Sequence, residues 1–455
     1  MIKPGNLDFL FRSDGGFIRL PVWGHIPLID PLKKVLAHPA FLRLKGIRQL
    51  SFAHHVFPGA THTRFEHSIG VYHLMKLILQ RLVTNPLSSS LQTETFYFDD
   101  RSCRLLLATS LLHDIGHYPH AHVIEKIPIS STGASTFDGH EMLAERWIRE
   151  SYSGFGSLAE IIENDWQLEA REVVNMISGK ERMDFAKIIN GTLDPDKMDY
   201  LMRDAHHCNI PYGSIDIERL IESFVPDPDR QRFAITDKGV APLESLMFAK
   251  YMMMRNVYWH HTARTFSAML RRLVQDILDD GILEPQKCRE LFYANADERV
   301  LYDLKEALPK QGFSGTELID QILVRQPYKR AISLKLFEED FFGKDLSQVL
   351  PKLFEFSKNP GLRKQKEMAL CRMLNRDFGL ALKGHEIIID APVHKHIFDY
   401  EDFCELRIYR TPKANRKSEK HAGGQFISFD HSGDSAFRSD FILEFERYTK
   451  KFRVV

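Results

Sequence analysis

Apolar residues recur at helical spacing over most of this chain. Residues 64–83 and 103–117 give two strong helix predictions, and helical patterns continue from residue 140 to about 380. The first helix should stop at Asn85, because a residue that precedes proline is unfavourable in a helix. The second stretch is apolar on nearly all sides, which predicts that it is buried. The pattern therefore predicts a mainly α fold built around these two helices.

Strand patterns are confined to the two ends of the sequence. Residues 17–30 predict a short strand or hairpin, followed by a helix over 31–50 that breaks near Pro39. Beyond residue 381 the apolar period shortens, and a terminal helix is predicted over 434–451. The strands expected in this small α+β C-terminal lobe are 385–389, 404–409 and 425–429.

Polar and glycine-containing segments separate these elements. We expect loops over 87–101 and 131–139, and a basic loop over 411–424. Asp194-Pro195 is typical of a helix start, since aspartate can cap the first turn and proline is favoured within it.

Composition narrows the range of partners. The 455 residues contain 61 Lys plus Arg and 61 Asp plus Glu, so no net charge attracts nucleic acid or an anionic membrane. The five cysteines are scattered, which argues against a cysteine zinc site and a disulfide framework and favours a reducing cytoplasm. The N-terminus lacks a signal-peptide pattern, and no apolar stretch is long enough to span a bilayer. We therefore expect a cytoplasmic protein without a membrane or nucleic-acid partner.

The histidines are clustered along the sequence. Ten of the 21 lie between His54 and His140, which indicates a metal or proton-transfer site. The pair His113-Asp114 ends an apolar helix, where an imidazole and a carboxylate are costly to bury unless something pairs with them. A divalent metal would satisfy both groups. A packed core histidine beside a surface aspartate is the alternative.

Two further stretches strengthen the metal interpretation. His117 lies four residues after His113, on the same helix face, and His67 lies on the preceding predicted helix, which can pack antiparallel to it. Asp196 begins a later helix and could supply another ligand. Nitrogen and carboxylate ligands suit iron, manganese, zinc or nickel. A polar stripe follows Asp196 along the same helix and comprises Tyr200, Arg203, Asp204 and His207. The alternative interpretation of this stripe is a solvated charged face.

Four motifs follow one another in a fixed order. They are VFPGA at 56–60, TRFEHSIG at 63–70, HDIGH at 113–117, and DPDKMDY at 194–200 with RDAHH at 203–207. Together they resemble the HD-domain deoxynucleoside triphosphate triphosphohydrolases (dNTPases), above all the HD domain of the vertebrate sterile-alpha-motif/HD-domain member and its bacterial relatives. The resemblance extends from about residue 17 to 265 and implies the HD fold.

The resemblance implies a role for each matching residue. The implied metal ligands are His67, His113, Asp114 and Asp196. The residues implied to hold phosphate oxygens, together with a magnesium ion on the phosphates, are Arg64, Lys197 and Lys250. The residues implied to contact or underlie the sugar are Tyr200, Asp204 and Tyr258, with Gln49 and Leu50 at its 3′-hydroxyl side. The implied proton-handling group comprises His117, His122, Glu125 and His140, with His122 as the acid for the departing 5′-oxygen.

Some positions depart from the vertebrate pattern. Glu125 stands where that member has an aspartate, and Lys250 stands where it has an arginine. Ala37, Leu42 and Lys45 differ from the residues that bind an activating guanine nucleotide there, so the resemblance does not imply this activation.

We therefore expect hydrolysis of a dNTP to a deoxynucleoside and inorganic triphosphate. The expected organisation is an HD phosphohydrolase catalytic domain over 1–290, a helical extension over 291–380 and the small lobe over 381–455, assembled as a homo-oligomer. Two alternatives stay open. One is an HD phosphohydrolase acting on another nucleotide, as a monophosphatase, alarmone hydrolase or phosphodiesterase. The other is a nucleotide-sensing or nucleic-acid-binding HD module.

Overall fold

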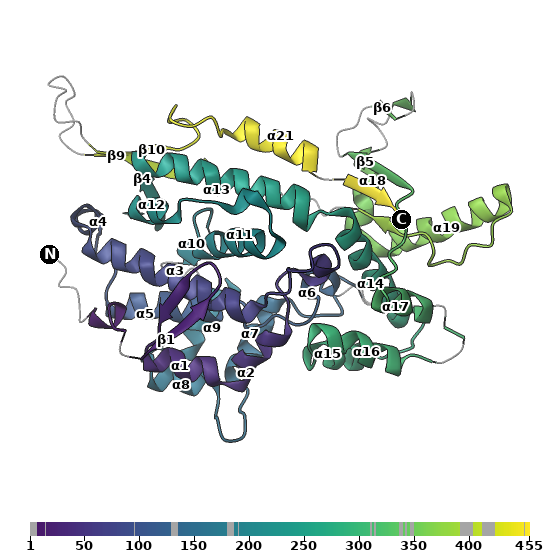
Figure 1. Ribbon diagram of the computed structural model, residues 1–455, viewed down its shortest axis with the longest axis horizontal. Coiled ribbons are helices and arrows are strands. Elements are labelled where there is room, and N and C mark those ends of the chain that lie inside the picture. Colours follow the sequence, from purple (N-terminus) through teal and green to yellow (C-terminus); the bar gives the residue numbers. More distant parts are fainter. Residues whose placement is uncertain are drawn as a thin grey trace.

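Two helices that are near neighbours in the sequence and a third that follows much later form the centre of the molecule in the computed structural model (Figure 1). α3 (Arg64–Thr84) packs against both α5 (Asp100–Leu112) and α11 (Pro195–Cys208). Side chains on nearly every face of α3 and α5 are buried, as the apolar pattern predicts. The mainly α fold class is confirmed. The residues described are 7–13, 15–94, 96–128, 135–179, 186–189, 191–309, 312–313, 315–335, 340–341, 344–345, 350–391, 404–411, 424–449 and 451–455.

Side-chain caps fix the starts of two central helices. At α5 the Asp99 carboxylate accepts from the Ser102 backbone N at 2.8 Å, and the Ser102 hydroxyl accepts from the Asp99 backbone N at 2.9 Å. At α11 the Asp194 carboxylate accepts from the Lys197 backbone N at 2.8 Å, which confirms the predicted helix start.

Two predicted boundaries near α5 are wrong. Residues 87–101 are not all loop, because Asn85 caps a short helix, α4 (Pro86–Leu91). α5 also ends at Leu112 rather than at residue 117. A turn follows, in which Gly116 lies against the backbone carbonyl of His140, where a Cβ would overlap. This close approach docks the turn on α7 (His140–Arg149).

The N-terminal prediction is confirmed for the hairpin and for the break near Pro39, but the helix predicted to residue 50 ends at Leu42 and is followed by a 3-10 turn (Arg43–Gly46). β1 (Phe17–Leu20) and β2 (Gly24–Pro27) form an antiparallel hairpin. α1 (Asp30–Ala37) and α2 (Pro39–Leu42) follow, and the break between them lies at His38, before Pro39.

A four-stranded sheet joins the middle of the chain to its C-terminal part, in the order β10-β9-β4-β3. The hairpin of β3 (Phe224–Asp227) and β4 (Arg232–Thr236) lies inside the stretch predicted as helical. Nearly all of its residues are buried, so it has no alternating pattern to reveal it. β9 (Arg407–Arg410) and β10 (Gln425–Ser428), which match the expected strands, extend this hairpin.

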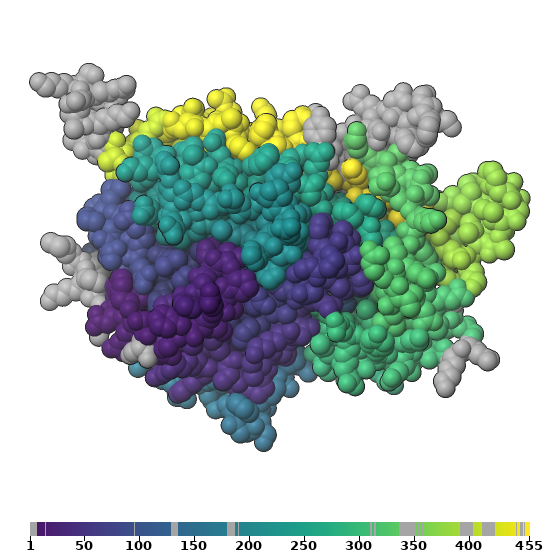
Figure 2. All heavy atoms as spheres, viewed as in Figure 1, coloured from purple at the N-terminus to yellow at the C-terminus, as the bar shows by residue number. Residues whose placement is uncertain are grey.

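A second sheet has the order β5-β11-β8. β5 (Ile332–Lys335) and β8 (Ile389–Asp390) flank β11 (Lys451–Val454), a strand that the sequence analysis does not predict. The terminal helix α21 (Ser439–Thr449) begins five residues later than predicted. It lies along α13 (Val240–Met253), with Phe445 stacked on Tyr251 at 4.0 Å between ring centroids, and Figure 2 shows the two segments in direct contact. The proposed boundaries at 290 and 380 stay a prediction.

The remaining elements surround the three central helices and the two sheets. Among the described residues no helix is both long and apolar enough to cross a bilayer. Residues 131–134 and 412–423, parts of two predicted loops, lie outside the described residues. The remaining bounds are α6 (Ala121–Ile124), α8 (Leu158–Asn164), α9 (Ala170–Ser178), α10 (Ala186–Ile189), α12 (Ile217–Glu222), α14 (His261–Asp279), α15 (Pro285–Tyr293), α16 (Asp297–Ala307), α17 (Gly315–Leu323), α18 (Leu350–Lys358), α19 (Pro360–Phe378), β6 (Asp340–Phe341) and β7 (Lys344–Asp345).

Candidate active site

The four predicted metal ligands converge where α3, the turn after α5, and α11 meet. His67 Nε2 lies 3.0 Å from Asp196 Oδ1, and His113 Nε2 lies 3.7 Å from the same oxygen. Asp114 completes the group, with its oxygens 3.5 Å from His113 Nε2 and 3.7 Å from His67 Nε2. We call these residues the metal quartet.

The second nitrogen of each quartet histidine is already engaged. His67 Nδ1 donates to Asp199 Oδ2 at 2.8 Å, and His113 Nδ1 donates to the Ser110 carbonyl at 2.9 Å. These bonds fix the tautomer in which both Nε2 lone pairs point into the quartet. His113 Nε2 is buried and has no hydrogen-bond partner among the described residues. The donor set therefore fits a divalent metal ion.

The charges of the quartet agree with a cation site. Burial alone would raise the pKa of both aspartates, but the basic neighbours of Asp114, and the close approach of His113 and His67 to Asp196, hold both below their usual range. Burial would lower the pKa of His67, yet hydrogen bonds to Asp196 and Asp199 raise it to about 10, so a proton on Nε2 competes with a metal ion for the same lone pair. The site thus stabilises ionised carboxylates with positive charge between them.

Asp199 is a supporting residue to which the sequence analysis gave no role. It accepts from His67 Nδ1 and from two nitrogens of Arg203 at 2.8 Å each, and it also accepts from Trp23 Nε1. Gly70 on α3 faces the Asp199 carboxylate, where a Cβ would overlap, so glycine permits this approach of α3 and α11. The available signal was the i,i+4 spacing of Asp199 and Arg203 on a buried helix.

Arg64, predicted to hold phosphate, borders the quartet. Its guanidinium donates to Asp114 Oδ2 at 2.6 Å, and both side chains are buried. Lys197 bonds the Gly191 carbonyl at 2.8 Å and the carboxylate of Asp194. Lys250 lies on α13, which packs against α11. The phosphate roles of these residues stay a prediction.

The predicted proton-handling residues form a connected array beside the quartet. His117 Nδ1 lies 3.2 Å from Asp114 Oδ1, and His117 Nε2 lies 3.4 Å from His122 Nε2. Glu125 bridges the outer members, with its oxygens 3.6 Å from His122 Nδ1 and 3.2 Å from His140 Nδ1. His117 is fully enclosed, whereas the His122 side chain is 61% exposed. This histidine array therefore runs from a quartet carboxylate to solvent.

The predicted sugar residues also meet. The Asp204 carboxylate accepts from the Tyr258 hydroxyl at 2.6 Å and from His62 Nε2 at 2.7 Å. The rings of Tyr200 and Tyr258 are 6.2 Å apart. Tyr258 ends a π-helical turn (Met254–Tyr258), a deviation that often accompanies functional sites. His62 was not predicted, because no spacing connects it to α11.

Gln49 and Leu50 lie on a segment that pairs with the start of α3. The Gln49 backbone N donates to the His62 carbonyl at 3.1 Å, and the Arg64 backbone N donates to the Ile47 carbonyl at 2.9 Å. The Gln49 side-chain oxygen is buried without a hydrogen-bond partner among the described residues. It is thus available to a ligand, whereas the role of Leu50 stays a prediction.

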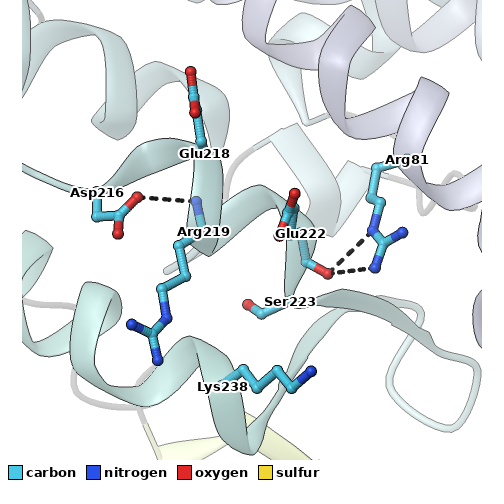
Figure 3. Close-up of a pocket in the computed structure, with 7 residues that line it drawn as sticks. All are labelled: Arg81, Asp216, Glu218, Arg219, Glu222, Ser223 and Lys238. Carbon is cyan, nitrogen blue, oxygen red and sulfur yellow. Dashed lines mark hydrogen bonds between the residues drawn. The ribbon is translucent and has the colours of Figure 1, made fainter.

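A separate polar pocket of about 410 Å³ lies between α3, α12 and the segment after β4 (Figure 3). It contains no quartet or array residue. Three acidic and three basic side chains line it, so its balanced charge gives a phosphate no net attraction. Figure 3 shows the Arg81 guanidinium donating to the Glu222 carbonyl, a contact that ties α3 to α12.

The fold and this site bring together, at the junction of three helices, histidine and aspartate side chains that could hold a metal ion. Residues 64–200 match the HD domain model, and residues 215–349 match the HD associated region. These matches bear out the resemblance of the chain to the HD-domain dNTPases.

Three individual proteins illustrate this similarity. An uncharacterized protein of Methanocaldococcus jannaschii is 28% identical over 70% of this chain and 60% of its own. The deoxynucleoside triphosphate triphosphohydrolase SAMHD1 homolog of Dictyostelium discoideum is 27% identical over 71% of this chain and 61% of its own. The chain thus spans about three fifths of the length of these relatives. A crystal structure of a phosphohydrolase from Bacteroides thetaiotaomicron VPI-5482 has the same fold, with a TM-score of 0.67, 21% identity, and coverage of 96% of this chain and 98% of the other.

Proposed function

We propose that this protein hydrolyses deoxynucleoside triphosphates to deoxynucleosides and inorganic triphosphate. The observation that carries the proposal is the junction of the metal quartet with the histidine array, where Asp114 lies 3.2 Å from His117. Cleavage of a phosphoester requires activation of the phosphorus, a nucleophilic water and an acid for the departing oxygen. The quartet and the array supply these functions side by side. The substrate class is supported by the dNTPase relatives.

The metal quartet would hold a divalent transition metal, which polarises a phosphoryl oxygen and makes water nucleophilic at neutral pH. Arg64 offers fixed positive charge at the edge of the quartet, 2.6 Å from Asp114. It would offset negative charge that builds on the phosphoryl oxygens during transfer. Lys197 and Lys250 would hold the outer phosphates, together with any magnesium ion that accompanies them.

His122 would protonate the 5′-oxygen as it leaves the phosphorus. Burial would raise the pKa of Glu125, but the interactions of this carboxylate with His122 and His140 have the larger combined effect. They keep the pKa of Glu125 below its usual range. Burial lowers the pKa of His122, and the ionised Glu125 carboxylate opposes this shift. Because His122 is exposed, water can restore its proton after each turnover. His117 and His140 would orient it within the array.

Deoxyribose would bind against Tyr200, Asp204 and Tyr258. The Asp204 carboxylate is shared between Tyr258 and His62, which fixes its orientation before a ligand arrives. The buried oxygen of Gln49 would accept a hydrogen bond from a sugar hydroxyl, with Leu50 packing beside it.

The test is a product assay on purified protein with manganese and each of the four dNTPs. Release of deoxynucleoside and triphosphate from at least one dNTP is expected. Release of orthophosphate or pyrophosphate, or cleavage of another phosphoester with no dNTP turnover, would instead favour a different HD phosphohydrolase. Strong, salt-dependent binding of single strands by inactive protein would favour the binding-module alternative. Light scattering on the same samples tests the proposed homo-oligomer, whose expected mass is at least twice that of the chain.

A further inference from the structure

Ser51 and His120 form an unusual hydrogen-bonded pair. Both are non-glycine residues in the left-handed backbone region, with φ of 45° and 54°. Ser51 Oγ lies 2.7 Å from His120 Nδ1. Such backbone conformations cost free energy and persist where the surroundings over-determine them, which occurs most often at functional sites.

The His120 ring is held firmly on its other sides. It is buried and stacks on Phe52, with 4.4 Å between centroids and 12° between planes. Its Nε2 lies 3.9 Å from Asp297 Oδ1, the first residue of α16. The other oxygen of Asp297 accepts the backbone N–H of Arg48. His120 and Asp297 therefore fasten the two ends of the 48–51 segment.

This segment carries Gln49 and borders the active site. Its middle is hydrogen-bonded to His62, which in turn holds Asp204. His120 is the N-cap residue of α6, the short helix that carries His122. The Ser51–His120 bond therefore joins the segment with the free Gln49 oxygen to the turn with the proposed acid.

The order serine, histidine, aspartate invites comparison with a nucleophilic triad. The geometry does not support that reading, because 3.9 Å between His120 Nε2 and Asp297 Oδ1 exceeds hydrogen-bond length. Ser51 also forms one end of the 48–51 segment, and its hydroxyl is used to hold that segment in place. A positioning role accounts for all three contacts.

We propose that the Ser51–His120 pair positions Gln49 to accept a hydrogen bond from a hydroxyl group of the bound nucleotide. This inference rests on the proposed function for the identity of the nucleotide. A buried acceptor without a partner is unfavourable until a ligand donor forms a hydrogen bond with it. Small displacements of the segment therefore weaken recognition of that donor. The pair thus acts through Gln49, as a positioning element for substrate choice.

The discriminating variant is Ser51→Gly. Glycine removes the hydroxyl and also relieves the left-handed backbone, so the fold is retained or stabilised. Gln167→Gly is the matched control, because Gln167 is exposed and has a φ of 56° outside this segment. His120→Asn is the conservative variant, because asparagine tolerates the left-handed region and its side-chain oxygen can accept from Ser51.

The readout is the ratio of kcat/KM for a dNTP to that for its 2′,3′-dideoxy analogue. Ser51→Gly should lower this ratio about tenfold, as expected for loss of one well-placed hydrogen bond, while Gln167→Gly leaves it unchanged and His120→Asn restores part of it relative to His120→Ala. An unchanged ratio in Ser51→Gly, or equal loss on both substrates, would overturn the proposal.

A binding measurement separates this inference from the proposed reaction. If the wild type turns over no dNTP, the shift in melting temperature caused by each of the two nucleotides replaces the rate. If the wild type prefers the hydroxyl-bearing nucleotide and Ser51→Gly loses this preference, the positioning role is supported even though the proposed reaction has failed. Absence of any preference in the wild type overturns it.

Discussion

His67 donates its Nδ1 hydrogen to Asp199 across 2.8 Å, and this bond turns the opposite ring nitrogen toward Asp196. Asp199 is held in place by Arg203, whose guanidinium donates to both carboxylate oxygens. The orientation of a proposed metal ligand is therefore set by two residues that would not touch the metal. Supporting shells of this kind govern metal affinity as well as ligand geometry.

Asp199→Asn should weaken metal binding without removing a ligand. The amide keeps the size of the side chain but loses the charge that holds the His67 tautomer, so the affinity should fall about 10- to 100-fold. Competition with a chelator of known affinity measures the change. Asp303→Asn, at an ion pair with Arg299 on α16, is the control and should bind metal as the wild type does. Unaltered affinity in Asp199→Asn would show that the His67–Asp199 bond is dispensable.

Mutations in the metal quartet and in the histidine array should have different effects. His113→Ala removes a ligand and should lose both metal and activity. His122→Ala removes only the proposed acid, so it should retain metal while kcat falls about 10²- to 10⁴-fold. Metal content after gel filtration and initial rates on the same samples check both expectations. Loss of metal from His122→Ala, or a full rate, would contradict the division of roles.

The sequence was informative about the quartet because its ligands lie in short motifs at helix ends. His67, His113 and Asp196 fall in motifs that the dNTPase resemblance identifies, whereas the residues alone left a packed core histidine open as the alternative. The cap at Asp194 was likewise readable, because it depends on neighbouring residues alone. Local chemistry with a fixed spacing was therefore predictable.

Contacts between distant segments were not predictable in the same way. The His62–Asp204 bond joins residues 142 positions apart, and neither residue has a spacing that points to the other. β11 pairs with β5 and β8 from separate regions of the chain, and its four residues follow directly on a helix. Pairings of this kind depend on which surfaces the helical body leaves available, which no local pattern records.

His73 on α3 should make stability depend on pH. Burial, and secondarily Lys76, lowers the pKa of His73 to about 4, below the value of about 6.5 for an unfolded histidine. The folded state therefore prefers neutral His73, and this contribution is complete above pH 6.5 and lost as the pH falls through 4. Relative to His73→Phe, the wild type should lose about 2–3 kcal/mol of unfolding free energy over this window.

Urea unfolding of both proteins between pH 7 and pH 4 measures that difference. His431→Phe, at a side chain that is 83% exposed, controls for removal of a histidine. Parallel pH profiles of the wild type and His73→Phe would contradict the expectation.

Asp390 holds three arginines at the junction of α14, β8 and β11. Arg264 donates to it at 3.1 Å and Arg453 at 3.3 Å, while Arg271 approaches to 3.8 Å. The Asp390 side chain is only 1% exposed, so Asp390→Asn would leave buried cations without their shared counter-charge. A loss of about 3–5 kcal/mol in the free energy of unfolding is expected, measured by chemical denaturation.

Arg271→Met is the matched comparison. Burial, with Arg363 nearby, lowers the pKa of Arg271 to about 9, and its buried NH2 group has no hydrogen bond among the described residues. Its removal should therefore change stability by less than about 1 kcal/mol or increase it. Equal losses in the two variants would show that the arginines do not depend on Asp390.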